Sequence, residues 1–179
     1  MSILLVYATV EGQTGKVADA VQEQLRTMGC EFEVMNTAEK TAPVTFKGVD
    51  KVILAAPVHE RRHPETFEVF LTAHRQELQK CETLLLSVSL SAAFPEGMEE
   101  AKEYVTELKM RTELEPSAEV LVAGAVRSRH YDYYATQVLR HVVLRDQDYN
   151  PAVDEHEFTD WEALAIEVAK FTGADEKIS

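Results

Sequence analysis

The chain of 179 residues is 45% hydrophobic, which suits one α/β domain with a sizeable core. Its formal net charge of −13 argues against nonspecific binding to nucleic acid or to an anionic membrane, because both partners are polyanions. No apolar run approaches the roughly 20 residues that cross a bilayer, and the apolar run that starts at residue 3 leaves no room for a signal peptide. We therefore expect one cytoplasmic domain over residues 1–179.

The first segment, Ile3 to Tyr7, is continuously apolar, which is typical of a strand covered on both faces of a parallel sheet. Apolar residues at helical spacing then predict a helix from Gln13 to Met28, and Gly29 supplies its stop. The loop between them is rich in small and polar residues. Its candidate binding residues are Thr9, Val10, Glu11, Gly12, Gln13 and Thr14.

A phosphate in this loop would accept hydrogen bonds from the hydroxyls of Thr9 and Thr14 and from backbone N–H groups at the positive end of the helix dipole. Gly12 would let the backbone come close. The loop is neither GxGxxG nor GK[ST], so dinucleotides and ATP are poor candidates. T-x-x-G-Q-T instead resembles the first loop of flavodoxin-like proteins, which wraps the single phosphate of FMN. The alternative is a turn capped by Thr14 that binds nothing.

Two further strands follow the first helix. Glu31 to Asn36 alternates like an edge strand, and the polar stretch from Thr37 to Val44 carries the chain onward without a full helix. Lys51 to Ala56 is the next buried strand. After a loop from Pro57 to Pro64, helical spacing predicts one helix, with Pro64 near its first turn, through apolar positions that end at Leu78.

The pattern then repeats once more. Thr83 to Ser89 predicts the fourth strand, a helix follows from about Pro95 to Lys109, and Glu119 to Val126 predicts the fifth strand. This alternation favours an α/β, flavodoxin-like three-layer sandwich whose five-stranded parallel sheet has the order 2-1-3-4-5, with an insert after the fifth strand.

In this order the ligand crevice lies at the carboxyl ends of the first and third strands, where the winding direction switches. The end of the fourth strand borders it. Two more loops therefore join the first at the crevice. Their candidate cofactor-binding residues are Pro57, Val58, His59, Glu60, Ser89, Leu90 and Ser91.

The segment from Arg127 to Phe158 is too long for one strand-to-helix connection and must carry additional structure. Its apolar helical stripe is flanked by basic residues, which suggests a dock for an anionic or membrane-held partner; the alternative is an ordinary helix with solvated arginines. Thr159 to Glu162 predicts a capping box that opens a last helix, with Trp161 facing the core.

Four segments carry a family resemblance: ATVEGQT at Ala8 to Thr14, SVSLSA at Ser87 to Ala92, AGAVR at Ala123 to Arg127, and FTDWE at Phe158 to Glu162. Together they resemble the menaquinone-dependent protoporphyrinogen oxidases over nearly the whole chain. The resemblance implies a flavodoxin fold, FMN, and electron transfer from a porphyrinogen of haem synthesis to a respiratory quinone.

The resemblance also implies partners for the insert. Arg127, Arg129 and Tyr131 are the candidates for binding a propionate-bearing tetrapyrrole or a quinone. Peripheral membrane contact through the insert and assembly into a homo-oligomer stay open. The chain departs from the family in the loop from His59 to His63, where the family tends to have aromatic residues and glycine, and in the added acids of the insert.

His59 and His63 are the candidate proton handlers, because histidine titrates near neutral pH, although no catalytic acid or base is assigned. The rival functions are an electron-carrier module and a flavoprotein quinone reductase with a different donor. No GxSxG elbow indicates a hydrolase, and neither Cys30 nor Cys81 has metal-ligand spacing. We expect both thiols to be reduced and partly buried.

Overall fold

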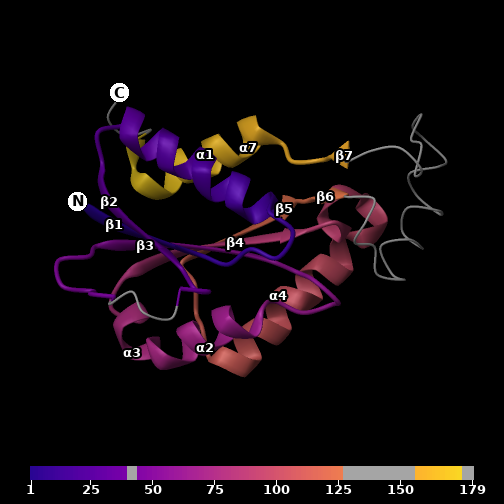
Figure 1. The fold of residues 1–179 in the computed structure, drawn as a ribbon, viewed down its shortest axis with the longest axis horizontal. Helices are drawn as coiled ribbons and strands as arrows, with labels where there is room; N and C mark the ends of the chain where they lie inside the picture. The colour runs from indigo at the N-terminus through magenta and orange to yellow at the C-terminus, as the bar shows by residue number, and fades with distance from the viewer. Residues whose placement is uncertain (40–43, 127–155, 175–179) are drawn as a thin grey trace.

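The computed structural model describes residues 1–39, 44–126 and 156–174, which form a parallel sheet between two helical layers (Figure 1). The strands of the main sheet are β1 (Ser2–Tyr7), β2 (Glu31–Asn36), β3 (Lys51–Pro57), β4 (Glu82–Ser89) and β5 (Ala118–Ala123). The α-helices are α1 (Gln13–Thr27), α2 (Glu65–Ala73), α3 (Arg75–Leu78), α4 (Met98–Thr112) and α7 (Trp161–Thr172). Among these helices none is long and apolar enough to cross a membrane.

The strand order β2-β1-β3-β4-β5 confirms the predicted order 2-1-3-4-5. All four pairings are parallel, so each connection crosses over the sheet and a helix can cover one of its faces. β2 lies at the edge, as its alternating sequence predicted. The described residues between β2 and β3 form no helix, and residues 40–43 lie outside the described part.

Alternate residues of the strands face two separate cores, because successive side chains of a strand point to opposite sides. Helices α1 and α7 cover one face, where Val21 and Leu164 join the buried strand residues. Helices α2, α3 and α4 cover the other face, where Phe67 and Leu108 do the same (Figure 1). The central strands therefore read as continuous apolar runs.

Two predicted elements are wrong in their extent. The expected single helix through Leu78 is broken at His74, which leaves α2 and a short α3. The expected helix from Pro95 begins with a 3-10 turn, η2 (Pro95–Gly97), and α4 continues to Thr112; a further turn, η1 (Ser91–Ala93), precedes η2.

The fifth strand leaves the main sheet earlier than predicted. β5 ends at Ala123. After Gly124, strand β6 (Ala125–Val126) pairs with strand β7 (His156–Glu157) in an antiparallel ribbon. The amide of Gly124 still donates a hydrogen bond to the Ser89 carbonyl oxygen at 2.9 Å. The chain thus turns away at Gly124, and most of the expected insert, residues 127–155, lies outside the described residues.

The capping box predicted at Thr159 is wrong by one residue. The Asp160 carboxylate is the cap of α7, since its Oδ1 accepts a hydrogen bond from the Ala163 amide at 3.0 Å. Trp161 is partly buried against the core on the α1 side, and its Nε1 donates to the Glu157 carboxylate at 2.7 Å. The indole ring is therefore only partly buried: it packs against this core, and its N–H group binds an exposed carboxylate.

Candidate functional site

Three loops begin at the same edge of the sheet, because hydrogen bonding between strands continues past their ends. The amide of Ala8 donates to the Ala55 carbonyl oxygen at 3.0 Å, and the amide of Val58 donates to the Val88 carbonyl oxygen at 2.8 Å. A side-chain contact also joins the first two loops, since His59 Nδ1 lies 3.5 Å from Glu11 Oε1. The first and second loops thus meet where the sequence predicted a crevice.

The first loop has the geometry of an anion-binding turn. Gly12 is the N-cap residue of α1 and has a left-handed backbone with φ 93°, which a residue with a side chain rarely adopts. Its amide donates to the hydroxyl of Thr9 at 3.0 Å, which closes the turn. Within the described part of the chain no side chain caps α1, and the N-terminus of a helix is a place where backbone N–H groups can bind an anion.

Thr14 is the residue that best fits a bound phosphate. Its side chain is 1% exposed, and among the described residues its hydroxyl has no hydrogen-bond partner. A buried, unpaired hydroxyl costs roughly 1–3 kcal/mol, so such groups are usually satisfied. Since Thr14 does not cap α1, the alternative of a turn capped by Thr14 is wrong. A phosphate oxygen would supply the missing acceptor, and the loop fits that group.

The remaining residues of the first loop differ in their roles. The Gln13 side-chain amide donates to the Thr159 hydroxyl at 3.0 Å, so this side chain links the loop to the start of α7. Val10 is 50% exposed at the tip of the loop, and Glu11 is half-buried beside His59.

The second loop closes in a tight two-residue turn. His59 and Arg62 exchange backbone hydrogen bonds of 2.9 and 3.1 Å, and Glu60 and Arg61 between them have φ values of 50° and 68°. This is the backbone pattern of a type I′ turn, which favours Asn and Gly. Left-handed backbone costs a residue with a Cβ roughly 1–2 kcal/mol, so the turn is strained at two positions.

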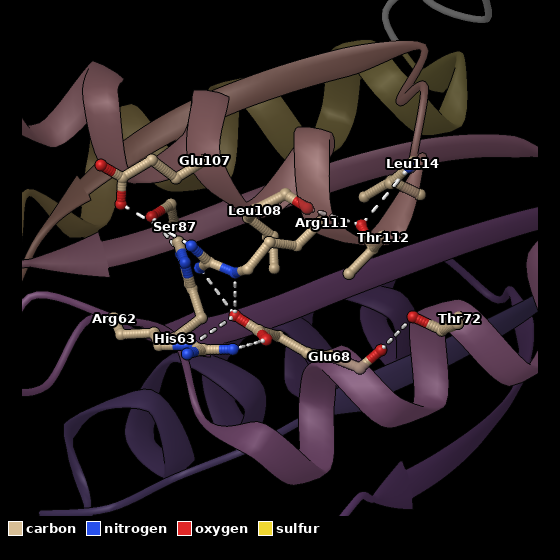
Figure 2. A network of polar contacts seen from close by, with 10 residues as sticks. All are labelled: Arg62, His63, Glu68, Thr72, Ser87, Glu107, Leu108, Arg111, Thr112 and Leu114. Atoms are coloured by element: carbon tan, nitrogen blue, oxygen red, sulfur yellow. Dashed lines mark hydrogen bonds and ion pairs between the residues drawn. The ribbon is translucent and has the colours of Figure 1, made fainter.

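His63, one of the two candidate proton handlers, is buried, so the alternative that it is an ordinary surface histidine is wrong. Its side chain is 1% exposed, and its Nε2 lies 2.9 Å from the Ser87 hydroxyl on β4 (Figure 2). Burial lowers the pKa of His63 to about 4, so the ring is neutral at physiological pH. Loop position suggested exposure, but the chain turns inward at this residue before α2 begins.

A buried carboxylate beneath the second loop was missed by sequence reasoning. Glu68 on α2 is 7% exposed and pairs with two arginines, Arg62 of the loop and Arg111 of α4 (Figure 2). Burial alone would raise the pKa of Glu68, but hydrogen bonds from both guanidinium groups outweigh it and hold the pKa below its usual value. No sequence signal links Glu68 to Arg111, because they are 43 positions apart.

The third loop is buried and closely packed. The Ser89 hydroxyl accepts a hydrogen bond from the Ala92 amide at 3.2 Å, and both Ser89 and Ser91 are buried. A Cβ added to Gly97 would lie 2.3 Å from the Ser91 carbonyl oxygen, so only glycine lets η2 pack against this loop. Leu90 is half-buried between the two serines.

The candidate partner residues Arg127, Arg129 and Tyr131 lie outside the described residues. Val126 and His156, which flank residues 127–155 in the sequence, are described and pair with each other in the β6–β7 ribbon. Lys16 of α1 lies 3.5 Å from the Glu157 carboxylate, so the ribbon is next to the first turn of α1. The described residues on either side of 127–155 therefore lie beside the first turn of α1.

A doubly wound parallel sheet with a hydroxyl-bearing, glycine-containing loop at its switch point defines a flavodoxin-like protein. The flavodoxin domain family matches residues 4–151, and the chain belongs to that family.

Two kinds of relatives agree with this assignment. The chain is 24% identical over 166 residues to protoporphyrinogen IX dehydrogenase [quinone] of Escherichia coli strain K12, covering 92% of this chain and 91% of the relative. Oxidised flavodoxin 1 from Bacillus cereus superposes with a TM-score of 0.56 at 17% identity, covering 97% of this chain and 98% of the other. Fusobacterium nucleatum flavodoxin bound to flavin mononucleotide superposes with a TM-score of 0.52 at 12% identity, covering 98% and 97%. The two structures support the fold.

Proposed function

We propose that the chain is an FMN-dependent oxidoreductase that takes electrons from a porphyrinogen and passes them to a quinone. FMN is the cofactor that the flavodoxin family and its FMN-bound structural neighbour support. The porphyrinogen and quinone follow from similarity to the Escherichia coli dehydrogenase, which extends over 92% of this chain. The observation that carries the FMN part of the proposal is the buried Thr14 hydroxyl, which has no hydrogen-bond partner among the described residues and which a phosphate oxygen would satisfy.

The first loop would hold the FMN phosphate through the hydroxyl of Thr14 and backbone N–H groups of the first turn of α1, while the hydrogen bond from the Gly12 amide to the Thr9 hydroxyl keeps the turn closed. The ring would lie between the second loop, at Pro57 to Glu60, and the third loop, at Ser89 to Ser91. When bound, FMN supplies the hydride and electron chemistry, and the protein supplies orientation and electrostatics. The carboxylates of Glu11 and Glu60 would disfavour the negative charge of a reduced flavin and would therefore lower the reduction potential of the bound FMN.

The substrate would bind beside the insert. Arg127, Arg129 and Tyr131 provide positive charge and an aromatic ring where the chain leaves the β6–β7 ribbon. Guanidinium groups bind carboxylates strongly, so these arginines suit the propionates of a tetrapyrrole. Contact with a membrane-held quinone through the same segment belongs to this proposal, as does the organisation of residues 1–179 as one domain.

A second candidate function is an electron carrier that docks protein partners, or a quinone reductase with another donor. The net charge of −13 and the carboxylates of Glu11 and Glu60 beside the crevice favour it, because an acidic rim attracts basic partner proteins. A carrier would exchange electrons with proteins and oxidise no porphyrinogen.

One anaerobic assay separates these functions. The purified protein, which should be yellow and contain noncovalent FMN, is mixed with protoporphyrinogen and a menaquinone analogue, and porphyrin is followed by its absorbance. Porphyrin formation that depends on the quinone would support the enzyme. Flavin reduction by NADH without any reduction by porphyrinogen would refute the porphyrinogen assignment and leave the flavoprotein. A colourless protein that gains no stability with FMN would refute both.

A further inference from the structure

The turn from His59 to Arg62 is strained, yet three carboxylates from three other parts of the chain hold its basic side chains. Glu11 of the first loop faces His59 at 3.5 Å, Glu100 of α4 faces Arg61 at 3.7 Å, and Glu68 of α2 binds Arg62. The last contact is by far the strongest. Arg62 Nη2 lies 2.6 Å from Glu68 Oε2 and Arg62 Nε lies 3.2 Å from Oε1, which is a bidentate pair.

The surroundings of Glu68 determine which group would move if its charge were lost. Arg111 also binds Glu68, with Nε at 2.9 Å and Nη2 at 2.7 Å from Oε1, and it has a second carboxylate, Glu107, at 3.7 Å (Figure 2). Arg111 is fixed on a long helix, whereas the side chain of Arg62 is 56% exposed on a loop. Without the charge of Glu68 the two arginines would repel each other. The loop that carries Arg62 would then move, because Arg62 is less constrained than Arg111.

We propose that Glu68 is a positioning residue, which acts through Arg62 to hold the strained His59–Arg62 turn in the conformation that lines the flavin crevice. The proposal rests on the proposed function, because the wall formed by Pro57 to Glu60 matters only if the ring lies against it. An exposed ion pair contributes little to stability, but Glu68 is buried and its carboxylate receives hydrogen bonds from two separate elements.

The preset turn benefits binding because a ligand need not order the loop itself. Glu60 and Arg61 would each leave the left-handed region if the turn were free, and the backbone of Val58 and His59 would move with them. The Glu68 carboxylate binds Arg62 and Arg111, whereas the first loop contacts the turn through the Glu11–His59 pair at 3.5 Å. Loss of Glu68 should therefore weaken contacts to the ring more than those to the phosphate.

The test compares Glu68→Gln with the wild-type protein in two ways. In the FMN-free protein, amide hydrogen exchange at His59 and Arg62 should accelerate about tenfold, because a weaker hold opens the turn more often. Dissociation constants for FMN and for riboflavin, which lacks the phosphate, should both increase about tenfold and by the same factor. Arg62→Gln cuts the link from the loop side and leaves the buried Glu68–Arg111 pair intact, so it should reproduce both effects.

Rescue and control variants separate positioning from general destabilisation. Arg61→Gly added to Glu68→Gln should restore both affinities to within about threefold of wild type, because glycine accepts φ 68° without strain. Glu119→Gln is the control, because the Glu119 carboxylate on β5 pairs with Lys109 on α4 at 2.5 Å. This variant should change neither hydrogen exchange at the turn amides nor flavin affinity.

Unchanged turn amides and unchanged riboflavin affinity in folded Glu68→Gln or Arg62→Gln would overturn the proposal. So would a loss of affinity that Arg61→Gly does not restore, because that result indicates a purely structural role. A wild-type protein that binds no flavin would refute the proposed function instead, and exchange at His59 and Arg62 would still decide whether Glu68 holds the turn.

Discussion

The side-chain amide of Gln13 donates a hydrogen bond to the hydroxyl of Thr159 at 3.0 Å, across 146 positions of sequence. The same hydroxyl donates to the Ala123 carbonyl oxygen at 2.6 Å, where β5 ends. One buried threonine thus joins the first loop, the end of β5 and the start of α7. Helix α7 is therefore linked by hydrogen bonds to the loop in which we propose the phosphate site.

Thr159→Val tests this connection. Valine keeps the shape and removes both hydrogen bonds, so Gln13 and the Ala123 carbonyl group lose a buried partner. We expect the free energy of unfolding to fall by about 1–3 kcal/mol and FMN affinity to fall with it. Thr172→Val is the control, because Thr172 is also buried but, among the described residues, donates its hydroxyl only within α7, to Val168 and Ala169. A Thr159→Val protein with wild-type FMN affinity would contradict the connection.

Thr14→Val should have opposite effects on the free and the FMN-bound protein. The free protein should be as stable as wild type or more stable by up to about 1 kcal/mol, because the substitution removes a buried hydroxyl without a partner. FMN affinity should fall about 10- to 100-fold, since a hydrogen bond to a charged group is lost. Chemical denaturation and fluorescence titration measure the two quantities.

Thr9→Val gives the contrast for that experiment. The Thr9 hydroxyl already accepts a hydrogen bond from the Gly12 amide, so its loss should destabilise the free protein by about 1 kcal/mol. If Thr14→Val destabilised the free protein as much as Thr9→Val does, the Thr14 hydroxyl would have a partner in solution and the phosphate assignment would weaken.

The lowered pKa of the buried His63 side chain predicts how the free energy of unfolding depends on pH. The unfolded chain binds a proton at His63 below about pH 6.5, whereas the folded protein binds it only below about pH 4. Between these values the unfolded state holds more protons, so the free energy of unfolding should fall by about 3 kcal/mol as the pH falls from 6.5 to 4. His63→Gln should flatten this part of the profile in urea titrations. An equally steep loss in His63→Gln would show that another group is responsible.

The strand order and the meeting of the first two loops at one edge of the sheet could be predicted from the sequence, because they follow from patterns within each segment. Buried parallel strands are continuously apolar, and right-handed crossovers leave few orders for five of them. Loops at the carboxyl ends of β1, β3 and β4 then had to meet. The FMN prediction depended on the hydroxyl-bearing loop from Thr9 to Thr14 together with the expected meeting of all three loops at the switch point.

Other features depend on contacts between distant segments, which local patterns do not contain. Burial of His63 requires Ser87 on β4, and burial of Glu68 requires Arg111 on α4. The early end of β5 at Ala123 reflects the antiparallel pairing of Ala125 and Val126 with β7, 30 positions further along the chain. In each case an ordinary residue type takes its role from a partner that the sequence pattern does not identify.

Charge reversal in the insert should separate substrate turnover from cofactor binding. Porphyrinogen carries two propionates, so Arg127→Glu with Arg129→Glu should replace attraction by repulsion at the proposed substrate side. Quinone-dependent porphyrin formation should fall at least about tenfold, a change equivalent to about 1.4 kcal/mol, while FMN content should stay near wild type. The phosphate would still be held by the first loop, which does not include these arginines.

Arg26→Glu with Lys80→Glu is the matched control. It makes the same change in net charge at exposed positions, at the end of α1 and just before β4, where the amino ends of the strands lie. Porphyrin formation should be nearly unchanged in this protein, and the effect of the insert variant should shrink as salt screens the charges. Equal losses in both double variants would mean that net charge alone governs the rate, and loss of FMN from the insert variant would mean that the two sites are not separate.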